Sequence, residues 1–140
     1  MILTCNYEEI TALTHGAQVY LEDAGGADVL LPTPGANRVE VEALLARLGG
    51  YLSVRTLEDQ RDLETGIRAV VQFLREVVDS RVLAAHPADE EAVSAYFDFA
   101  HALSVLQRVI HMGEEMTALV ELMGGGVPGE RSVREFVFPD

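Results

Sequence analysis

The amino-acid sequence predicts a mainly α fold: a long antiparallel helical hairpin packed by two shorter N-terminal helices, with short peripheral β segments near the termini. Between residues 56 and 123, apolar residues recur at alternating spacings of three and four, the heptad spacing of packed helices. Ala85-His86-Pro87 interrupts this pattern near its middle. Because so short a connection forces the chain to reverse, the two helices must lie antiparallel.

The hairpin helices can be bounded from local signals. The first is expected to begin at Thr56, where Thr56 and Asp59 form a capping signal, and to end near Ala85. The second follows Pro87 and runs to about Met123, where consecutive glycines end it. The predicted inward residues are Leu63, Ile67, Val70, Leu74 and Val77 on the first helix and Tyr96, Phe99, Leu103, Leu106 and Ile110 on the second. Gly113 falls on this seam and predicts either close helix approach or a bend.

Shorter elements precede the hairpin. Ile2 to Cys5 is β-prone, and Asn6 with Glu9 predicts a capping box for a first helix ending near Glu22. Asn37 with Glu40 predicts a second capping box, for a short helix stopped by Gly49-Gly50. Residues 51–54 are expected to be extended.

The tail, residues 133–138, has strand composition. We expect it either to pair with Ile2 to Cys5 or to dock into a neighbouring subunit. The whole chain, 1–140, is predicted to form a single helical domain: N-terminal helices and loops over 1–55, the hairpin over 56–123, and a Gly-rich linker with an extended tail over 124–140.

Composition excludes several classes of function. The net charge of −13 opposes binding to nucleic acid or to an anionic membrane surface. The chain contains no Lys, which excludes Schiff-base and P-loop lysine chemistry. Its single cysteine, Cys5, is expected to be a small buried hydrophobe. With no signal-like or 18-residue apolar run, we expect a cytoplasmic protein, and the Arg-for-Lys bias indicates a bacterial source.

A second row on the later hairpin helix mixes apolar and polar side chains. The row consists of Phe97, His101, Ser104, Arg108, His111, Glu115 and Leu119. Such a mixture resembles a partly polar interface more than a solvated surface, so we expect a homodimer that forms a four-helix bundle through this row. The arginines Arg61, Arg68 and Arg75 also recur in line on the first hairpin helix, where a solvated face with weak ion pairs is the expected role.

Candidate metal ligands are few. Asp98 with His101, and His111 with Glu114 or Glu115, have the spacing that places two ligands on one helical face. Each pair supplies only two ligands, and the Glu-x-x-His pattern of ferritin-like bundles is absent. We therefore expect no cofactor, and a metal ion only if two copies combine their His111 and Glu115 faces.

Function is predicted from these features as follows. No Gly-x-Ser-x-Gly or His-Glu-x-x-His motif occurs, and no adjacent acid pair can act as a catalytic dyad. The sequence predicts a non-catalytic interaction or scaffold module that self-associates. Binding of a second, different protein is also compatible with this prediction. The alternative is a helical bundle with a metal or small-molecule site on the face from Phe97 to Leu119.

Overall fold

The computed structural model describes residues 1–23, 37–49, 51–84, 90–124 and 137–138. The elements follow in the order β1 (Ile2–Thr4), α1 (Tyr7–Asp23), α2 (Arg38–Arg47), β2 (Tyr51–Ser53), α3 (Leu57–Ala84) and α4 (Glu90–Gly124). The prediction of a mainly α fold with short strands at the periphery is confirmed. None of the described helices is both long enough and apolar enough to cross a membrane.

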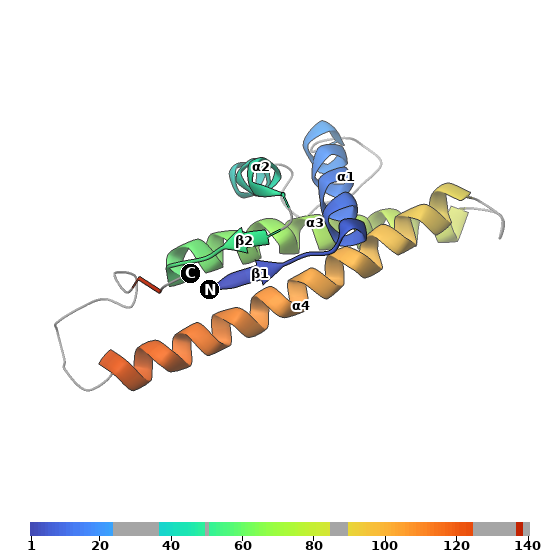
Figure 1. The fold of residues 1–140 in the computed structure, drawn as a ribbon. Coiled ribbons are helices and arrows are strands. Elements are labelled where there is room, and N and C mark those ends of the chain that lie inside the picture. The colour runs from blue at the N-terminus through green and yellow to red at the C-terminus, as the bar shows by residue number, and fades with distance from the viewer. Residues whose placement is uncertain (24–36, 50, 85–89, 125–136, 139–140) are drawn as a thin grey trace.

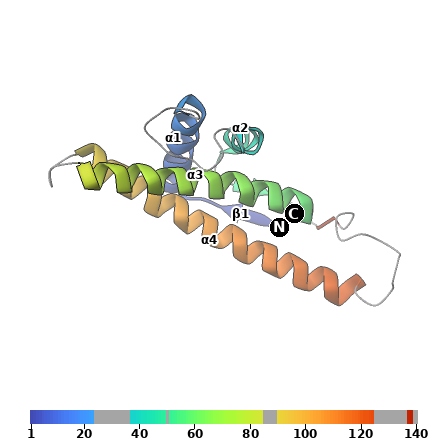
Figure 2. The same cartoon turned by 180° about the vertical axis from the view of Figure 1, so that it is seen from behind.

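Helices α3 and α4 lie side by side and antiparallel as the predicted hairpin (Figure 1). Helix α2 lies on the opposite side of α3 from α4, whereas α1 crosses the hairpin and packs against both α3 and α4 (Figure 2). The C-terminal turns of α4 extend past the start of α3, where Leu122 and Met123 are exposed. The predicted connection at Ala85-His86-Pro87 lies outside the described residues.

The predicted inward positions are confirmed for α3 and, with one exception, for α4, where Leu106 is buried and Phe99, Leu103 and Ile110 are partly buried against the core. On α3, Leu63, Ile67, Val70 and Leu74 are buried. On α4, Tyr96 is 55% exposed, so its predicted inward position is wrong. The buried face of α4 consists of Ala102, Val105, Leu106, Val109, Met112, Met116 and Val120. Because α4 packs against α1 as well as α3, its buried stripe is centred between these two neighbours rather than on α3 alone.

Capping explains where α1 and α3 begin. Asn6 Oδ1 accepts from the Glu9 N–H at 2.8 Å and Glu9 Oε1 accepts from the Asn6 N–H at 2.9 Å, which completes the predicted capping box. Thr56 Oγ1 accepts from the Asp59 N–H at 3.0 Å. The capping box predicted at Asn37 is wrong: its side chain makes no capping bond. The ψ of 24° there departs from the extended backbone that aims a cap side chain at the first turn.

The two strands pair with each other. Strand β1 runs antiparallel to β2 with Leu3 opposite Leu52. Among the described residues, the partner of β1 is therefore the short extended segment before α3, and the predicted pairing of Ile2 to Cys5 with the tail stays a prediction. Residues 133–136 of the tail lie outside the described residues. Phe138 is buried, and its N–H donates to the Arg55 carbonyl while Arg55 Nε donates to the Phe138 carbonyl at 3.1 Å.

Helix α2 is joined to β2 and α3 by one arginine. Arg47 Nη1 and Nη2 lie 2.7 and 3.1 Å from the two carboxylate oxygens of Asp59, and Nη2 also donates to the Ser53 carbonyl at 2.8 Å. Close approach of α2 to α3 depends on Gly66, because a Cβ there would lie 2.8 Å from the Glu40 carbonyl oxygen. These contacts fix the N-terminal half against the hairpin.

Candidate functional site

A long exposed surface of the described chain is the side of α4 that faces away from the core. We call this surface the outer face of α4. It consists of Val93, Phe97, Ala100, Ser104, Gln107, His111, Glu115, Ala118 and Leu122, all exposed. Phe97 is 57% exposed and Leu122 82% exposed, although both are large apolar side chains. Apolar side chains in a continuous helical row are a feature of interaction surfaces.

The structure places the predicted interface row partly on this face and partly on its flank. Phe97, Ser104, His111 and Glu115 belong to the outer face, and Leu119 is exposed beside it. Ser104 lies at the edge of this face, because its hydroxyl bonds to Glu9 of α1. His101 and Arg108 are only half-exposed. Arg108 turns toward α1 and β1, so its polar groups are used within the chain.

Arg108 forms the polar centre of the junction between α4, α1 and β1. Its guanidinium is paired with the carboxylate of Glu9, and its Nη1 donates to the Thr4 carbonyl at 2.6 Å. Glu9 is 5% exposed. Burial opposes ionisation of Glu9, but hydrogen bonds from the Asn6 N–H, the Arg108 guanidinium and the Ser104 hydroxyl together lower the pKa of this carboxyl below its usual range. In the sequence, Arg108 belongs to the predicted interface row and Glu9 to the predicted capping box. Neither pattern predicts their contact, which joins residues 99 positions apart.

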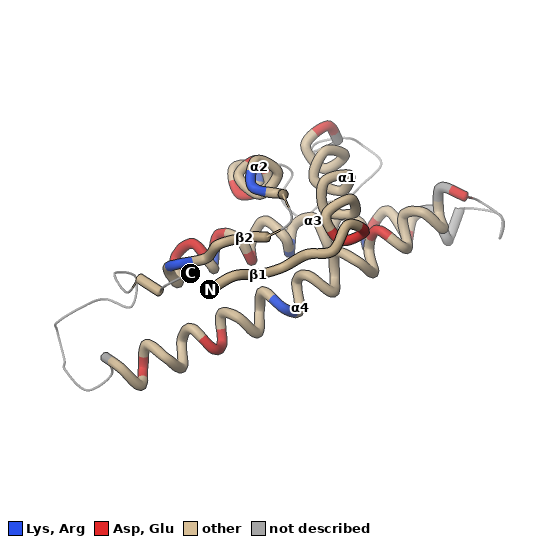
Figure 3. Tube along the Cα trace, in the orientation of Figure 1, with Lys and Arg blue, Asp and Glu red and all other residues tan. Residues whose placement is uncertain are grey.

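From Val93 to His111 the outer face carries no Asp, Glu, Lys or Arg residue. From Ala92 to Gly113, Asp98 and Arg108 are the only Asp, Glu, Lys or Arg residues, as the tube coloured by charge makes visible (Figure 3). Both have partners within the chain: Arg108 forms an ion pair with Glu9, and Asp98 forms a hydrogen bond with His15. Glu114, Glu115 and Glu121 lie beyond this stretch, toward the C-terminal end of the helix.

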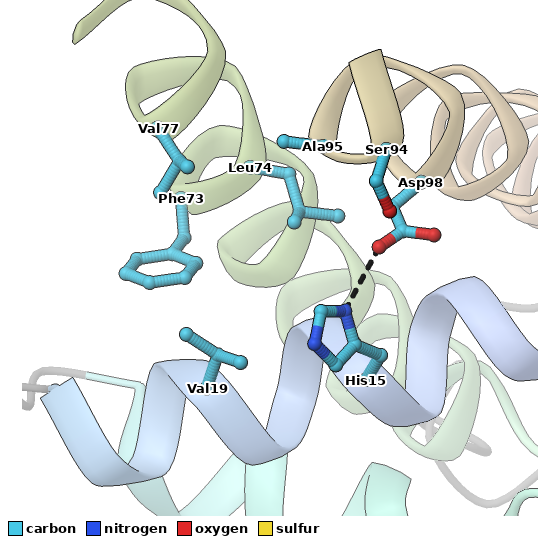
Figure 4. A pocket seen from close by; sticks show the side chains of 8 residues that line it. All are labelled: His15, Val19, Phe73, Leu74, Val77, Ser94, Ala95 and Asp98. Atoms are coloured by element: carbon cyan, nitrogen blue, oxygen red, sulfur yellow. Dashed lines mark hydrogen bonds and ion pairs between the residues drawn. The ribbon is translucent and has the colours of Figure 1, made fainter. Parts of the chain in front are cut away.

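A second feature is a hollow of about 350 Å³ between α1, α3 and α4. At its edge, His15 Nδ1 lies 2.8 Å from Asp98 Oδ2 (Figure 4). Asp98, which the sequence pairs with His101 as a candidate metal ligand, forms its hydrogen bond with a histidine of another helix, and the metal pairing stays a prediction. His15 belongs to no motif in the sequence, so the sequence alone does not indicate a site at this residue. No sequence signal relates residues 83 positions apart.

The other predicted metal pair is local. His111 Nε2 lies 3.0 Å from Glu115 Oε1, and His111 Nδ1 lies 3.8 Å from Glu114 Oε2, all three side chains being exposed on α4. Among the described residues, no three His, Cys, Asp or Glu side chains are grouped so that they could bind a metal ion. Two-ligand pairs on one exposed helix do not form a closed coordination site.

Compared with protein-family models, with curated protein sequences and with solved structures, the chain gives no match. What these side chains do is therefore inferred from their geometry and chemistry.

Proposed function

We propose that this chain is a non-catalytic interaction module that self-associates, two copies pairing through the outer face of α4. The observation that carries the proposal is that the outer face of α4 carries no Asp, Glu, Lys or Arg residue between Val93 and His111. A chain with net charge −13 repels its own copy. The outer face is a surface on which two such chains can meet without bringing carboxylates together.

Apolar burial supplies the attraction. Val93 and Phe97 are about half exposed near one end of the face, and Leu119 and Leu122 are exposed near the other. Each such side chain contributes roughly 1.5–3 kcal/mol when fully removed from water, less when burial is partial. The small residues Ala100 and Ser104 lie between these ends, and small side chains permit interaxial distances at the short end of the usual 8–10 Å.

The direction of pairing follows from charge. A parallel pair would bring Glu114, Glu115 and Glu121 of both copies together at one end. An antiparallel pair with its twofold axis near Gln107 separates these clusters and also sets the two helix dipoles in opposition, which is favourable. In that arrangement Val93 and Phe97 of each copy approach Leu122 and Leu119 of the other, and His101 approaches Glu114 or Glu115 of the other.

The proposal is tested by the mass in solution of two matched variants, Ala100→Glu and Ala46→Glu. Both residues are exposed alanines on helices, but Ala100 lies on the outer face of α4 and Ala46 on α2. Light scattering after gel filtration is expected to give twice the chain mass of 15.3 kDa for the unmodified protein. Ala46→Glu should leave this mass unchanged, whereas Ala100→Glu should raise the dissociation constant at least about tenfold, equivalent to 1.4 kcal/mol, because the new carboxylate faces Glu115 of the other copy.

A monomer at every concentration would contradict the proposal, and so would a dimer insensitive to Ala100→Glu. The alternative function, a metal or small-molecule site on the face from Phe97 to Leu119, needs a second copy to complete its ligands. Under the interaction proposal, dialysis against a chelator leaves both mass and thermal stability unchanged. A chelator-induced loss of either would favour the metal site.

A further inference from the structure

The hollow between α1, α3 and α4 has the composition of a small-molecule site. Its wall is formed by Val19 from α1, by Phe73, Leu74 and Val77 from α3, and by Ala95 from α4. Three polar side chains, His15, Ser94 and Asp98, line the remaining side. The volume of about 350 Å³ is within the range of ligand pockets, which combine a mainly apolar lining with a few oriented polar groups.

The orientation of His15 is set by Asp98. The Asp98 side chain is 19% exposed and accepts a hydrogen bond from His15 Nδ1 at 2.8 Å. An ionised carboxylate can only accept, so in the neutral imidazole the proton lies on Nδ1 and Nε2 is left as the acceptor. Figure 4 shows Nε2 on the side of the ring turned away from Asp98, toward Val19. Within the described part of the chain, Nε2 has no hydrogen-bond partner.

The side chains that line the hollow favour a ligand of a certain charge and hydrogen-bonding type. The wall favours an apolar body, and the free Nε2 favours a group that donates a hydrogen bond. Asp98 at the edge and the net charge of −13 disfavour carboxylates and phosphates. We propose that the hollow binds a small uncharged molecule with an apolar, ring-sized body and one hydroxyl or N–H group, which donates to Nε2 of His15.

Binding rather than hydrolysis fits the positions of the polar groups. Ser94 precedes Asp98 by one turn of α4, and Figure 4 places it on the Asp98 side of the imidazole. A serine nucleophile must instead contact the histidine nitrogen opposite the carboxylate. Among the described residues that line the hollow, no hydroxyl or thiol lies at Nε2. His15 is therefore a binding residue here, with Asp98 as its positioning residue.

Two probes of matched shape test the proposal: 1-naphthol, which has a hydroxyl donor, and 1-methoxynaphthalene, which lacks one. Titration of ¹⁵N-labelled full-length protein, followed by amide chemical shifts, is expected to move the signals of Val19, Leu74 and Ala95 with both probes. The naphthol should bind about two- to tenfold more tightly, as one net hydrogen bond provides. His15→Ala should abolish this preference, whereas His111→Ala, which removes an exposed histidine on the outer face of α4, should keep it.

A third variant separates the hollow from the hydrogen bond. Val19→Phe fills the space with a larger side chain and is expected to weaken both probes at least about tenfold without loss of helicity. The proposal is overturned if the signals of the hollow do not move at the solubility limit of the naphthol, or if both probes bind equally. It is also overturned if His15→Ala keeps the preference. These results do not depend on the dimer, because none of the residues lining the hollow belongs to the outer face of α4.

Discussion

The side-chain amide of Gln60 on α3 occupies the space that a side chain at Gly113 on α4 would need. A Cβ at Gly113 would overlap Gln60 Nε2 and lie 2.6 Å from Gln60 Cδ. Gln60 is 2% exposed, and its Nε2 donates to the Val109 carbonyl at 2.9 Å and to Glu64 Oε1 at 3.1 Å. The hairpin helices thus approach closely at a polar contact, and the glycine on the predicted seam is explained by close approach.

Gly113→Ala tests this contact. Alanine gains about 1 kcal/mol of helix propensity, but it displaces a buried amide whose lost hydrogen bonds cost about 1–3 kcal/mol. We expect net destabilisation of about 1 kcal/mol, measured by urea unfolding. In a Gln60→Ala background the obstruction is gone, so the same substitution should stabilise the protein. If Gly113→Ala changed the free energy of unfolding by the same amount with and without Gln60→Ala, the contact would be contradicted.

Glu9 should make stability depend on pH. Its folded-state pKa is lowered, so its contribution is present above the pKa of the unfolded chain, about 4.3, and is lost as pH falls through that value to the folded pKa. Glu9→Gln should destabilise the protein by about 1–2 kcal/mol near pH 7, an estimate reduced because Arg108 is 41% exposed. The difference between the two proteins should shrink below pH 4.

Urea unfolding at several pH values measures this difference. The control is Glu42→Gln, which removes one partner of the exposed ion pair between Arg38 and Glu42 at 3.1 Å and should change stability by less than about 0.5 kcal/mol. A difference for Glu9→Gln that is the same at pH 7 and at pH 3.5 would show that the charge of Glu9 does not stabilise the fold.

Cys5 should be unreactive in the folded protein. Burial raises the pKa of this thiol; the Arg108 charge acts in the opposite direction, and the Glu9 charge raises it further. Because the thiolate is the reactive form and the residue is 7% exposed, a maleimide at pH 7.5 should modify Cys5 about 100-fold or more slowly than in urea. Mass spectrometry over time measures both rates. Equal rates would mean that β1 opens freely.

The parts of the fold that sequence predicts are those encoded within one or two turns. The capping residues Asn6 and Thr56 give the starts of α1 and α3, and the spacing from Leu63 to Leu74 gives the inner face of α3. Which side of α4 is buried depends on where α1 packs against it. Apolar residues lie on more sides of α4 than one helix–helix contact needs. Heptad spacing alone therefore assigns Tyr96 to the inner face, whereas the structure exposes it.

The sites depend still more on distant residues. The exposed row of α4 is detectable because its residues share one helix, and the structure shifts it from His101 and Arg108 toward Ala100 and Gln107. The contacts of His15 with Asp98 and of Glu9 with Arg108 join residues far apart in the chain. Neither follows from spacing, because the fold alone brings α1 across α4.

The most direct test of self-association is a cross-link at the proposed twofold axis. Gln107 lies on the outer face of α4, and Gln72 is an equally exposed glutamine on α3. We would introduce Gln107→Cys and Gln72→Cys separately and treat each protein with a short bismaleimide linker at low micromolar concentration, with the native chain and its buried Cys5 as the blank. The account predicts a covalent dimer for Gln107→Cys, little for Gln72→Cys and none for the native chain. Equal cross-linking at the two glutamine positions, or none at Gln107→Cys, would contradict it.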